Sequence, residues 1–103
     1  MRDKIESYMG FARKAGAIVV GTDTCIISMK KKNIKLLIIA GDAATNSIEK
    51  LRNAAISNGV DFRVFSNKEK LSSYVGMQNK IAFGITDLGF ANAILKEIDF
   101  DVR

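Results

Sequence analysis

The segment Lys35 to Ala40, with the sequence KLLIIA, is the feature that most restricts the fold. Its apolar residues are continuous, whereas a strand with one face in water alternates apolar and polar residues. A run of this length is typical of a strand that is buried on both faces. Both faces of the sheet that contains it must then be covered, which favours helices packed on either side.

Apolar periodicity along the rest of the chain supplies those helices. Segments with apolar residues at helical spacing alternate with short strand-like segments, and proline is absent. We predict helices over residues 3–15, 22–32, 44–57, 67–74 and 87–99, and strands over residues 17–20, 35–40, 61–65 and 80–85. This alternation predicts an α/β sandwich with helices on both faces of one sheet. We expect residues 1–103 to form a single domain, since a chain of this length supports one core.

Glycines and short polar residues mark the predicted helix ends. Gly16 and the pair Asn58-Gly59 are placed to end the helices that precede them. A short side-chain oxygen caps a helix N-terminus because it accepts a free backbone N–H. We assign this role to Thr22 or Asp23 in the second helix and to Ser66 or Asn67 in the fourth.

Asp42 and Asp87 each follow a predicted strand almost directly. Carboxylates at strand ends can bind Mg²⁺ or act as acid and base. Each also precedes a predicted helix, where aspartate is a favoured cap and offsets the helix dipole. We favour capping and therefore predict no metal site and no catalytic residues. A small metal-dependent enzyme that uses both carboxylates is the remaining alternative.

Histidine is absent and Cys25 is the only cysteine. Catalytic systems built on histidine, cysteine zinc clusters and internal disulfides are therefore excluded. We place Cys25 on the apolar face of its helix, as a core residue. No apolar run approaches the roughly 20 residues that span a bilayer, and charge interrupts the N-terminal segment, unlike a signal peptide. These features predict a cytoplasmic protein with no membrane partner.

Positive charge is concentrated in the first half of the chain. Residues 1–52 contain ten Lys or Arg against five Asp or Glu, while residues 53–103 contain six of each. A surplus confined to one part of the chain indicates an anionic partner such as nucleic acid. A surface charge that serves only to keep the protein soluble is equally consistent with these counts, so the charge alone leaves both interpretations open.

The residues from Val19 to Asn33 combine a glycine turn with a basic helix end. Gly21 and three small polar residues begin a predicted helix, and three lysines end it. Free N–H groups at a helix N-terminus bind anions, and lysines beside the turn neutralise phosphates. The segment therefore predicts either a phosphate or RNA site, which Arg13 and Lys14 extend, or only a well-capped helix. The glycine pattern matches no dinucleotide or nucleoside-triphosphate motif.

Three segments together resemble the kink-turn-binding ribosomal protein family, in its small bacterial YlxQ-like branch. They are YMGFARKAGAIVVGTD, LLIIAGDAATNSIEKL and ITDLGFANAIL, of which the last is the most specific. The resemblance covers nearly the whole chain in the family's order and spacing. It implies a three-layer α/β/α sandwich around a mixed four-stranded sheet. It also implies RNA as the partner, without catalysis, a cofactor or a small-molecule substrate.

The resemblance further implies which residues contact RNA. In the family, the turn after the first strand docks on kinked RNA, and the loop before the last strand closes over the other side. Asp23, Thr24 and Ile27 stand where strong RNA binders have Asn, Glu and Lys, so base recognition is weakened or altered. The expected RNA-binding residues are Gly21, Thr22, Asp23, Thr24, Ile27, Lys30, Lys31, Asp42, Ala43, Gln78, Asn79, Lys80 and Ile81.

The functional prediction is a cytoplasmic RNA-binding protein that associates with ribosomal or other structured RNA, with ribosomal or other proteins as further partners. The alternative is a protein–protein interaction module that kept the fold and lost kink-turn recognition. The exposure of Ile27 separates the two. A buried Ile27 favours a residual RNA site, whereas an exposed isoleucine beside the turn suits a protein contact.

Overall fold

The computed structural model describes residues 3–101, which form five helices and four strands. Every predicted helix and strand is present, with ends that differ by at most two residues. The elements are α1 (Lys4–Lys14), β1 (Ile18–Val20), α2 (Thr22–Lys30), β2 (Leu36–Ala40), α3 (Thr45–Ser57), β3 (Asp61–Phe65), α4 (Lys68–Tyr74), β4 (Ala82–Ile85) and α5 (Leu88–Asp101).

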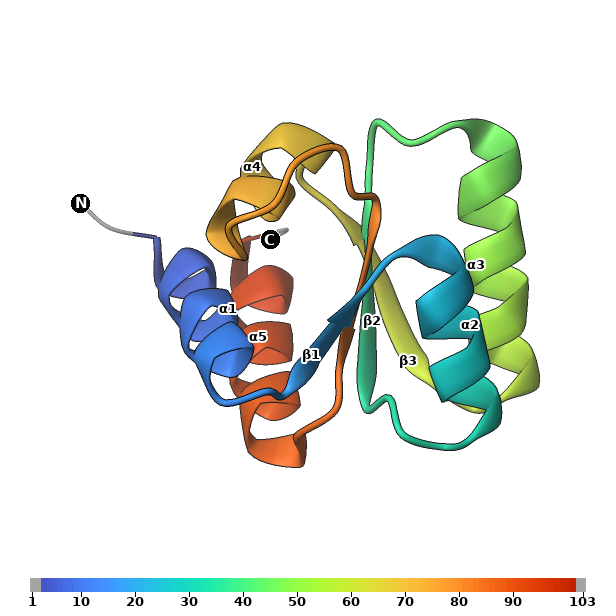
Figure 1. The fold of residues 1–103 in the computed structure, drawn as a ribbon, viewed down its shortest axis with the longest axis horizontal. Coiled ribbons are helices and arrows are strands. Elements are labelled where there is room, and N and C mark those ends of the chain that lie inside the picture. Colours follow the sequence, from blue (N-terminus) through green and yellow to red (C-terminus); the bar gives the residue numbers. More distant parts are fainter. Residues whose placement is uncertain (1–2, 102–103) are drawn as a thin grey trace.

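The strands form one mixed sheet in the order β1-β4-β2-β3. Strand β4 is antiparallel to both β1 and β2, while β3 runs parallel to β2. The C-terminal ends of β1, β2 and β3 therefore meet the N-terminal end of β4 at one end of the sheet. We call this the turn end, and it lies in the upper part of Figure 1. The predicted mixed four-stranded sheet is confirmed.

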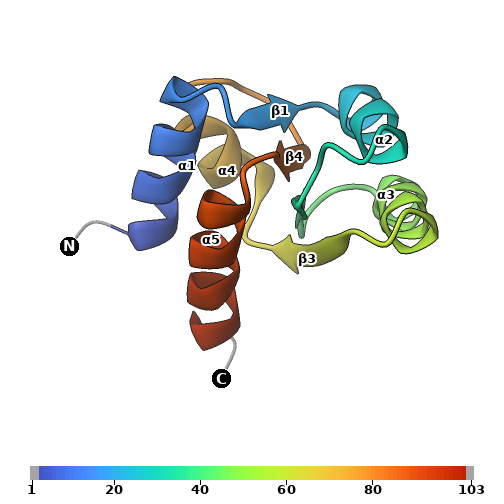
Figure 2. The same cartoon turned by 90° about the horizontal axis from the view of Figure 1, so that it is seen from below.

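Helices cover both faces of the sheet, so the predicted three-layer α/β/α sandwich is also confirmed. Helices α1, α4 and α5 lie on one face, and α2 and α3 lie on the other (Figures 1 and 2). The side chains of β2 alternate between the two cores. Leu36 and Ile38 pack with α1 and α5, whereas Leu37 and Ile39 pack with α2 and α3. All five residues of β2 are buried, as the continuous apolar run predicts.

Glycine allows close packing at the centre of the sheet. A Cβ at Gly84 of β4 would clash with the Ile34 side chain and lie 3.0 Å from Cγ2 of Val19. The absent side chain lets the segment after α2 pack directly on β4. Gly16 and Gly59 follow α1 and α3 with φ angles of +70° and +66°, which confirms their predicted role as helix ends.

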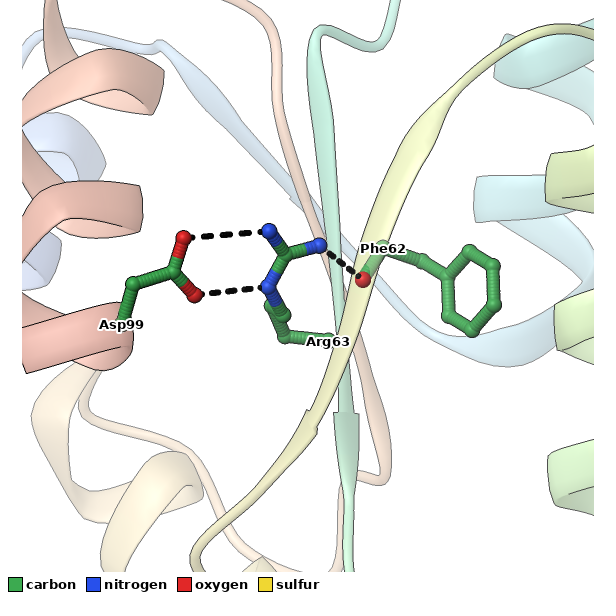
Figure 3. Close-up of polar contacts among 3 residues, drawn as sticks. All are labelled: Phe62, Arg63 and Asp99. Carbon is green, nitrogen blue, oxygen red and sulfur yellow. Dashed lines mark hydrogen bonds and ion pairs between the residues drawn. The ribbon is translucent and has the colours of Figure 1, made fainter. Parts of the chain in front are cut away.

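Strand β3 lies at the outer edge of the sheet and is tied to α5 by an ion pair. Nε and Nη2 of Arg63 donate to the two carboxylate oxygens of Asp99, at 2.8 and 3.1 Å. Nη1 of Arg63 donates to the Phe62 carbonyl at 2.8 Å (Figure 3). The guanidinium thus joins two elements that are 36 residues apart in the chain.

Between residues 3 and 101, no helix is both long enough and apolar enough to cross a membrane.

Candidate nucleic-acid interface

Helix α2 begins at the turn end without a side-chain cap. Gly21 occupies the N-cap position with φ 112° and ψ 147°, and it has no side chain to accept a hydrogen bond. The prediction that Thr22 or Asp23 caps the helix is wrong, because the sharp turn at Gly21 places both residues inside the first helical turn. Within residues 3–101, the N–H groups of that turn donate to no side-chain cap. They are the kind of free donors that bind anions.

Two backbone hydrogen bonds place the loop Gly76–Ile81 between the ends of β1 and β2. The Gly21 N–H donates to the Ala82 carbonyl, and the Ala40 N–H donates to the Ile81 carbonyl, both at 2.9 Å. The start of α2, the end of β2 and the loop before β4 therefore lie side by side. The chain segments 21–24, 42–43 and 78–81, which contain ten of the expected RNA-binding residues, therefore lie at the same end of the sheet.

A buried serine on α4 fixes the same loop. Ser72 is 1% exposed, and its Oγ accepts from the Lys80 N–H at 2.9 Å and lies 3.1 Å from the Lys80 carbonyl, to which it donates. Gln78 and Asn79 remain exposed, and Asn79 has a φ of 58°. The polar side chains of the loop tip thus face solvent above a loop base that is held in place.

Ser72 was missed in the sequence analysis. A serine beside another serine on a charged helix looks like a surface residue. The one sequence feature that indicates burial of Ser72 is its position. It lies next to Leu71 and three residues before Val75, both of which are buried.

The carboxylate of Asp42 caps a different helix from the one predicted. It accepts from the N–H of Lys68, the first residue of α4, at 2.8 Å, while α3 has Ala44 at its N-cap position and no side-chain cap. The reason is the close approach of Gly41 to the end of β3. The Gly41 N–H donates to the Ser66 carbonyl at 3.0 Å, and a Cβ at Gly41 would lie 2.9 Å from that oxygen. This contact carries Asp42 toward α4 and away from α3.

Asp87 and Asn67 cap helices as predicted. Asp87 accepts from the Phe90 N–H of α5 at 2.9 Å, and Asn67 accepts from the Lys70 N–H of α4 at 2.9 Å. Asp87 follows β4, so it lies at the end of the sheet opposite to Asp42. The two carboxylates cannot share one metal ion or act as one acid–base pair. Residues 3–101 also contain no cluster of three His, Cys, Asp or Glu side chains that could hold a metal.

The lysines that follow α2 do not lie beside the turn. Lys30 is the last residue of α2 and Lys31 is its C-cap. A helix of nine residues rises by about 13 Å, which separates these lysines from Gly21. The Lys35 N–H donates to the Ile85 carbonyl at 2.7 Å, at the far end of the sheet. The prediction that the lysines adjoin the turn is therefore wrong, because α2 runs away from the turn along its whole length.

Ile27 is 53% exposed on α2. Asp23, Ile27 and Lys30 are spaced at helical intervals and all three are exposed, so they form one solvent-facing stripe. The Asp23 carboxylate lies 3.8 Å from Nζ of Lys50 in an ion pair that is largely in solvent. Such a pair is screened by water and stabilises the fold little.

Arg13 supplies positive charge at the turn end. Its Nη1 lies 3.5 Å from Sδ of Met77, so the end of α1 is next to the loop before β4. Sequence reasoning named Arg13 as an extension of the lysine cluster, whereas its side chain instead adjoins the loop. Lys80 is half-buried in that loop. These two side chains place basic groups at the loop before β4.

Comparison with known proteins reveals relatives in sequence. A Bacillus subtilis protein named RNA-binding protein YlxQ is 25% identical over 91 residues, which span 88% of this chain and 91% of that protein. The protein of the same name from Enterococcus faecium is 31% identical over 91 residues, which span 87% of this chain and 86% of that protein.

Solved structures share the fold. A Bacillus halodurans protein described as having unknown function matches with a TM-score of 0.91 at 23% identity, over 95% of this chain and 99% of that chain. The Giardia lamblia 15.5kD RNA binding protein matches with a TM-score of 0.75 at 17% identity, over 97% and 89%. The sequence pattern of the ribosomal protein L7Ae/L30e/S12e/Gadd45 family matches residues 3–95. The chain therefore belongs to the ribosomal protein L7Ae/L30e/S12e/Gadd45 family.

Proposed function

We propose that this protein is a non-catalytic, cytoplasmic RNA-binding protein that contacts the backbone of a structured RNA, such as a kink-turn or ribosomal RNA, through the turn end. The observation that carries the proposal is the meeting of three chain segments, Gly21–Thr24, Asp42–Ala43 and Gln78–Ile81, around the uncapped start of α2. The relatives named RNA-binding protein YlxQ support RNA as the ligand.

The proposed contact is made chiefly by main chain and positive charge. The free N–H groups of the first turn of α2 donate to phosphate oxygens, aided by the positive end of the helix dipole. Gly21 has no side chain, so a phosphate can approach the backbone closely. Arg13 and Lys80 add positive charge from α1 and from the loop, and Gln78 and Asn79 offer exposed amides.

Base recognition through α2 is weak in this proposal. The Asp23 carboxylate only accepts hydrogen bonds and repels phosphate, and it faces Lys50. Thr24 has a short hydroxyl, and Ile27 makes no polar contact. Contacts to phosphates fix position without reading sequence, so we expect low selectivity among RNAs of similar shape.

The test is a fluorescence titration of the full chain against a kink-turn RNA, an unkinked duplex and a single-stranded RNA over a range of salt. Wild type should bind the kinked RNA at low salt, with an affinity that falls as salt rises. The pair R13Q/K80Q should weaken binding more than K4Q/K96Q, which removes the same charge from exposed sites elsewhere. Absence of binding to all three RNAs at low salt would contradict the proposal.

One observation favours a second function, a protein–protein interaction module. Ile27 is 53% exposed, and an apolar side chain in this stripe suits a protein contact better than a phosphate contact. The triple change D23N/T24E/I27K should create kink-turn affinity if only these positions have diverged. A triple variant that binds no better than wild type means that other parts of the surface have diverged as well.

A further inference from the structure

We propose that Lys30, Lys31, Lys32 and Lys35 form a second contact for RNA phosphates, separate from the turn end. We call this cluster the lysine end, because it lies where α2 ends and β2 begins. The inference rests on the proposed function only in taking RNA as the ligand. It adds a second binding surface at the opposite end of the sheet.

One short connection presents all four side chains. Lys30 ends α2, Lys31 is its C-cap, and Lys32 has a φ of 63° that turns the chain out of the helix. The Lys35 N–H then bonds to the Ile85 carbonyl, so the segment is attached to the sheet. All four residues are exposed. The charges are therefore held close together on a backbone that is fixed at both ends.

The charge of the lysine end is largely uncompensated. None of the four ammonium groups has a carboxylate within 4.0 Å among residues 3–101, and Nζ of Lys32 donates to the Asn58 carbonyl at 3.2 Å. Asp61 is the acidic residue in the shallow hollow that Lys32 and Lys35 also line. The helix dipole places about half a negative charge at the end of α2. The four positive charges of the lysines exceed the sum of these negative charges, so the surface attracts anions.

Distance makes this surface independent of the turn end. About 13 Å of helix separates Lys30 from Gly21, and the exposed apolar side chain of Ile27 lies between them. Charges in solvent are screened over about 8 Å at physiological ionic strength. At physiological salt the field of the lysines therefore strengthens the first contact only weakly, so a strong contribution from them needs a phosphate of their own.

RNA fits this surface better than a ligand with one charge. Four ammonium groups within six residues match a polymer that carries one phosphate per nucleotide. Lysine acts as a compact, flexible point charge, and its contacts to phosphates read no base sequence. A folded RNA that meets the turn end with one segment can meet the lysine end with another, and two linked contacts raise the overall affinity.

The test compares three variants by fluorescence titration against a kink-turn RNA and an unkinked RNA duplex between 50 and 200 mM salt. K30Q/K31Q/K35Q removes three charges but keeps Lys32, whose side chain bonds to Asn58. K4Q/K70Q/K96Q removes three exposed charges elsewhere and is the matched control. K30R/K31R/K35R keeps the charge and should bind like wild type.

The slope of log affinity against log salt is negative, and K30Q/K31Q/K35Q should reduce its magnitude by roughly 2 to 3. Each phosphate contact contributes about 0.7 to 0.9 to that magnitude. K4Q/K70Q/K96Q should reduce the magnitude of the slope much less. The effect of K30Q/K31Q/K35Q on the slope should persist in the R13Q/K80Q background, since the two surfaces are separate. Thermal unfolding of each variant, compared with that of wild type, checks that the variant remains folded.

Three results would overturn the inference. If the cluster variant behaves like its control, the second contact is absent while the proposed function stands. If wild type binds none of the kink-turn RNA, the unkinked duplex and the single-stranded RNA at low salt, the proposed function fails and the inference fails with it. If the cluster variant loses binding to anionic lipid vesicles but not to RNA, the lysine end is a membrane-surface contact instead.

Discussion

The backbone N–H of Gly21 donates a 2.9 Å hydrogen bond to the carbonyl of Ala82. This bond extends the pairing of β1 and β4 by one step beyond the Val20–Phe83 pair and then stops, because α2 begins at the next residue. The chain must therefore turn from strand to helix within a single residue. The φ of 112° at Gly21 achieves this, and no L-amino acid with a side chain adopts that conformation readily.

Gly21→Ala should accordingly destabilise the fold by about 1 to 3 kcal/mol through backbone strain. Steric overlap contributes little, since the nearest atom to a Cβ at this position is Oγ1 of Thr24 at 3.8 Å. Gly16→Ala is the matched control, because Gly16 has a φ of +70° with nothing within 4 Å of a Cβ. Urea unfolding should show the larger loss for Gly21→Ala. Equal losses would contradict the claim that Gly21 is the more strained position.

Ser72→Ala tests how the loop Gly76–Ile81 is held. The change removes the partner of both the N–H and the carbonyl of Lys80 within a buried site, which should cost about 1 to 3 kcal/mol. Hydrogen exchange of the loop amides should accelerate, and RNA affinity should fall if the loop contributes to binding.

Ser73→Ala is the control for this change. The Ser73 hydroxyl donates to the Lys70 carbonyl within its own exposed helix, so its loss should alter stability by less than about 0.5 kcal/mol. Similar losses for the two serines would show that Ser72 does not hold the loop.

The order and type of the elements could be predicted because each depends on local pattern. The apolar run of β2 and the helical spacing in α5 determine burial with little help from distant residues. The resemblance added the strand arrangement, which local pattern does not contain. The element ends were accurate where a cap or a positive-φ glycine lies next in sequence, as at Asn67 and Gly59.

The site was harder to predict because its geometry depends on contacts between distant residues. Asp42 caps α4 across 26 residues of chain, and Ser72 holds Lys80 across a turn. The lysines after α2 were misplaced for a simpler reason. Closeness in sequence was taken as closeness in space, whereas a straight helix places its two ends at opposite sides of the molecule.

The Arg63–Asp99 ion pair should stabilise the attachment of α5 to the edge strand by at most about 1 kcal/mol (Figure 3). The two side chains are 37% and 43% exposed, so water and salt screen the pair. A double-mutant cycle with Arg63→Met and Asp99→Asn isolates their coupling from other contacts of Asp99. The coupling energy should decrease in 0.5 M salt, because the Debye length falls from about 30 Å in 0.01 M buffer to about 4 Å. A coupling that is zero in low salt would contradict a stabilising role.

Burial raises the pKa of the Cys25 thiol from 9.0 to about 12, although a hydrogen bond with the backbone of Gly84 opposes the shift. The unfolded chain therefore loses this proton at a lower pH than the folded chain. The resulting stability is fully present below pH 9 and is lost as the pH rises toward 12. Between pH 8 and pH 10 the loss from this one group should be about 1 kcal/mol.

Cys25→Ala should remove this part of the pH dependence while lowering stability at pH 7 through the cavity that it leaves. Urea unfolding at pH 8, 9 and 10 separates the two effects, because the cavity cost does not vary with pH. The difference in unfolding free energy between wild type and variant should shrink by about 1 kcal/mol over this range. A thiol reagent offers an independent check, since Cys25 is 0% exposed and should react at pH 8 only after urea unfolds the chain. Rapid modification of the native protein would show that α2 opens locally and that burial does not raise the pKa of the Cys25 thiol as described.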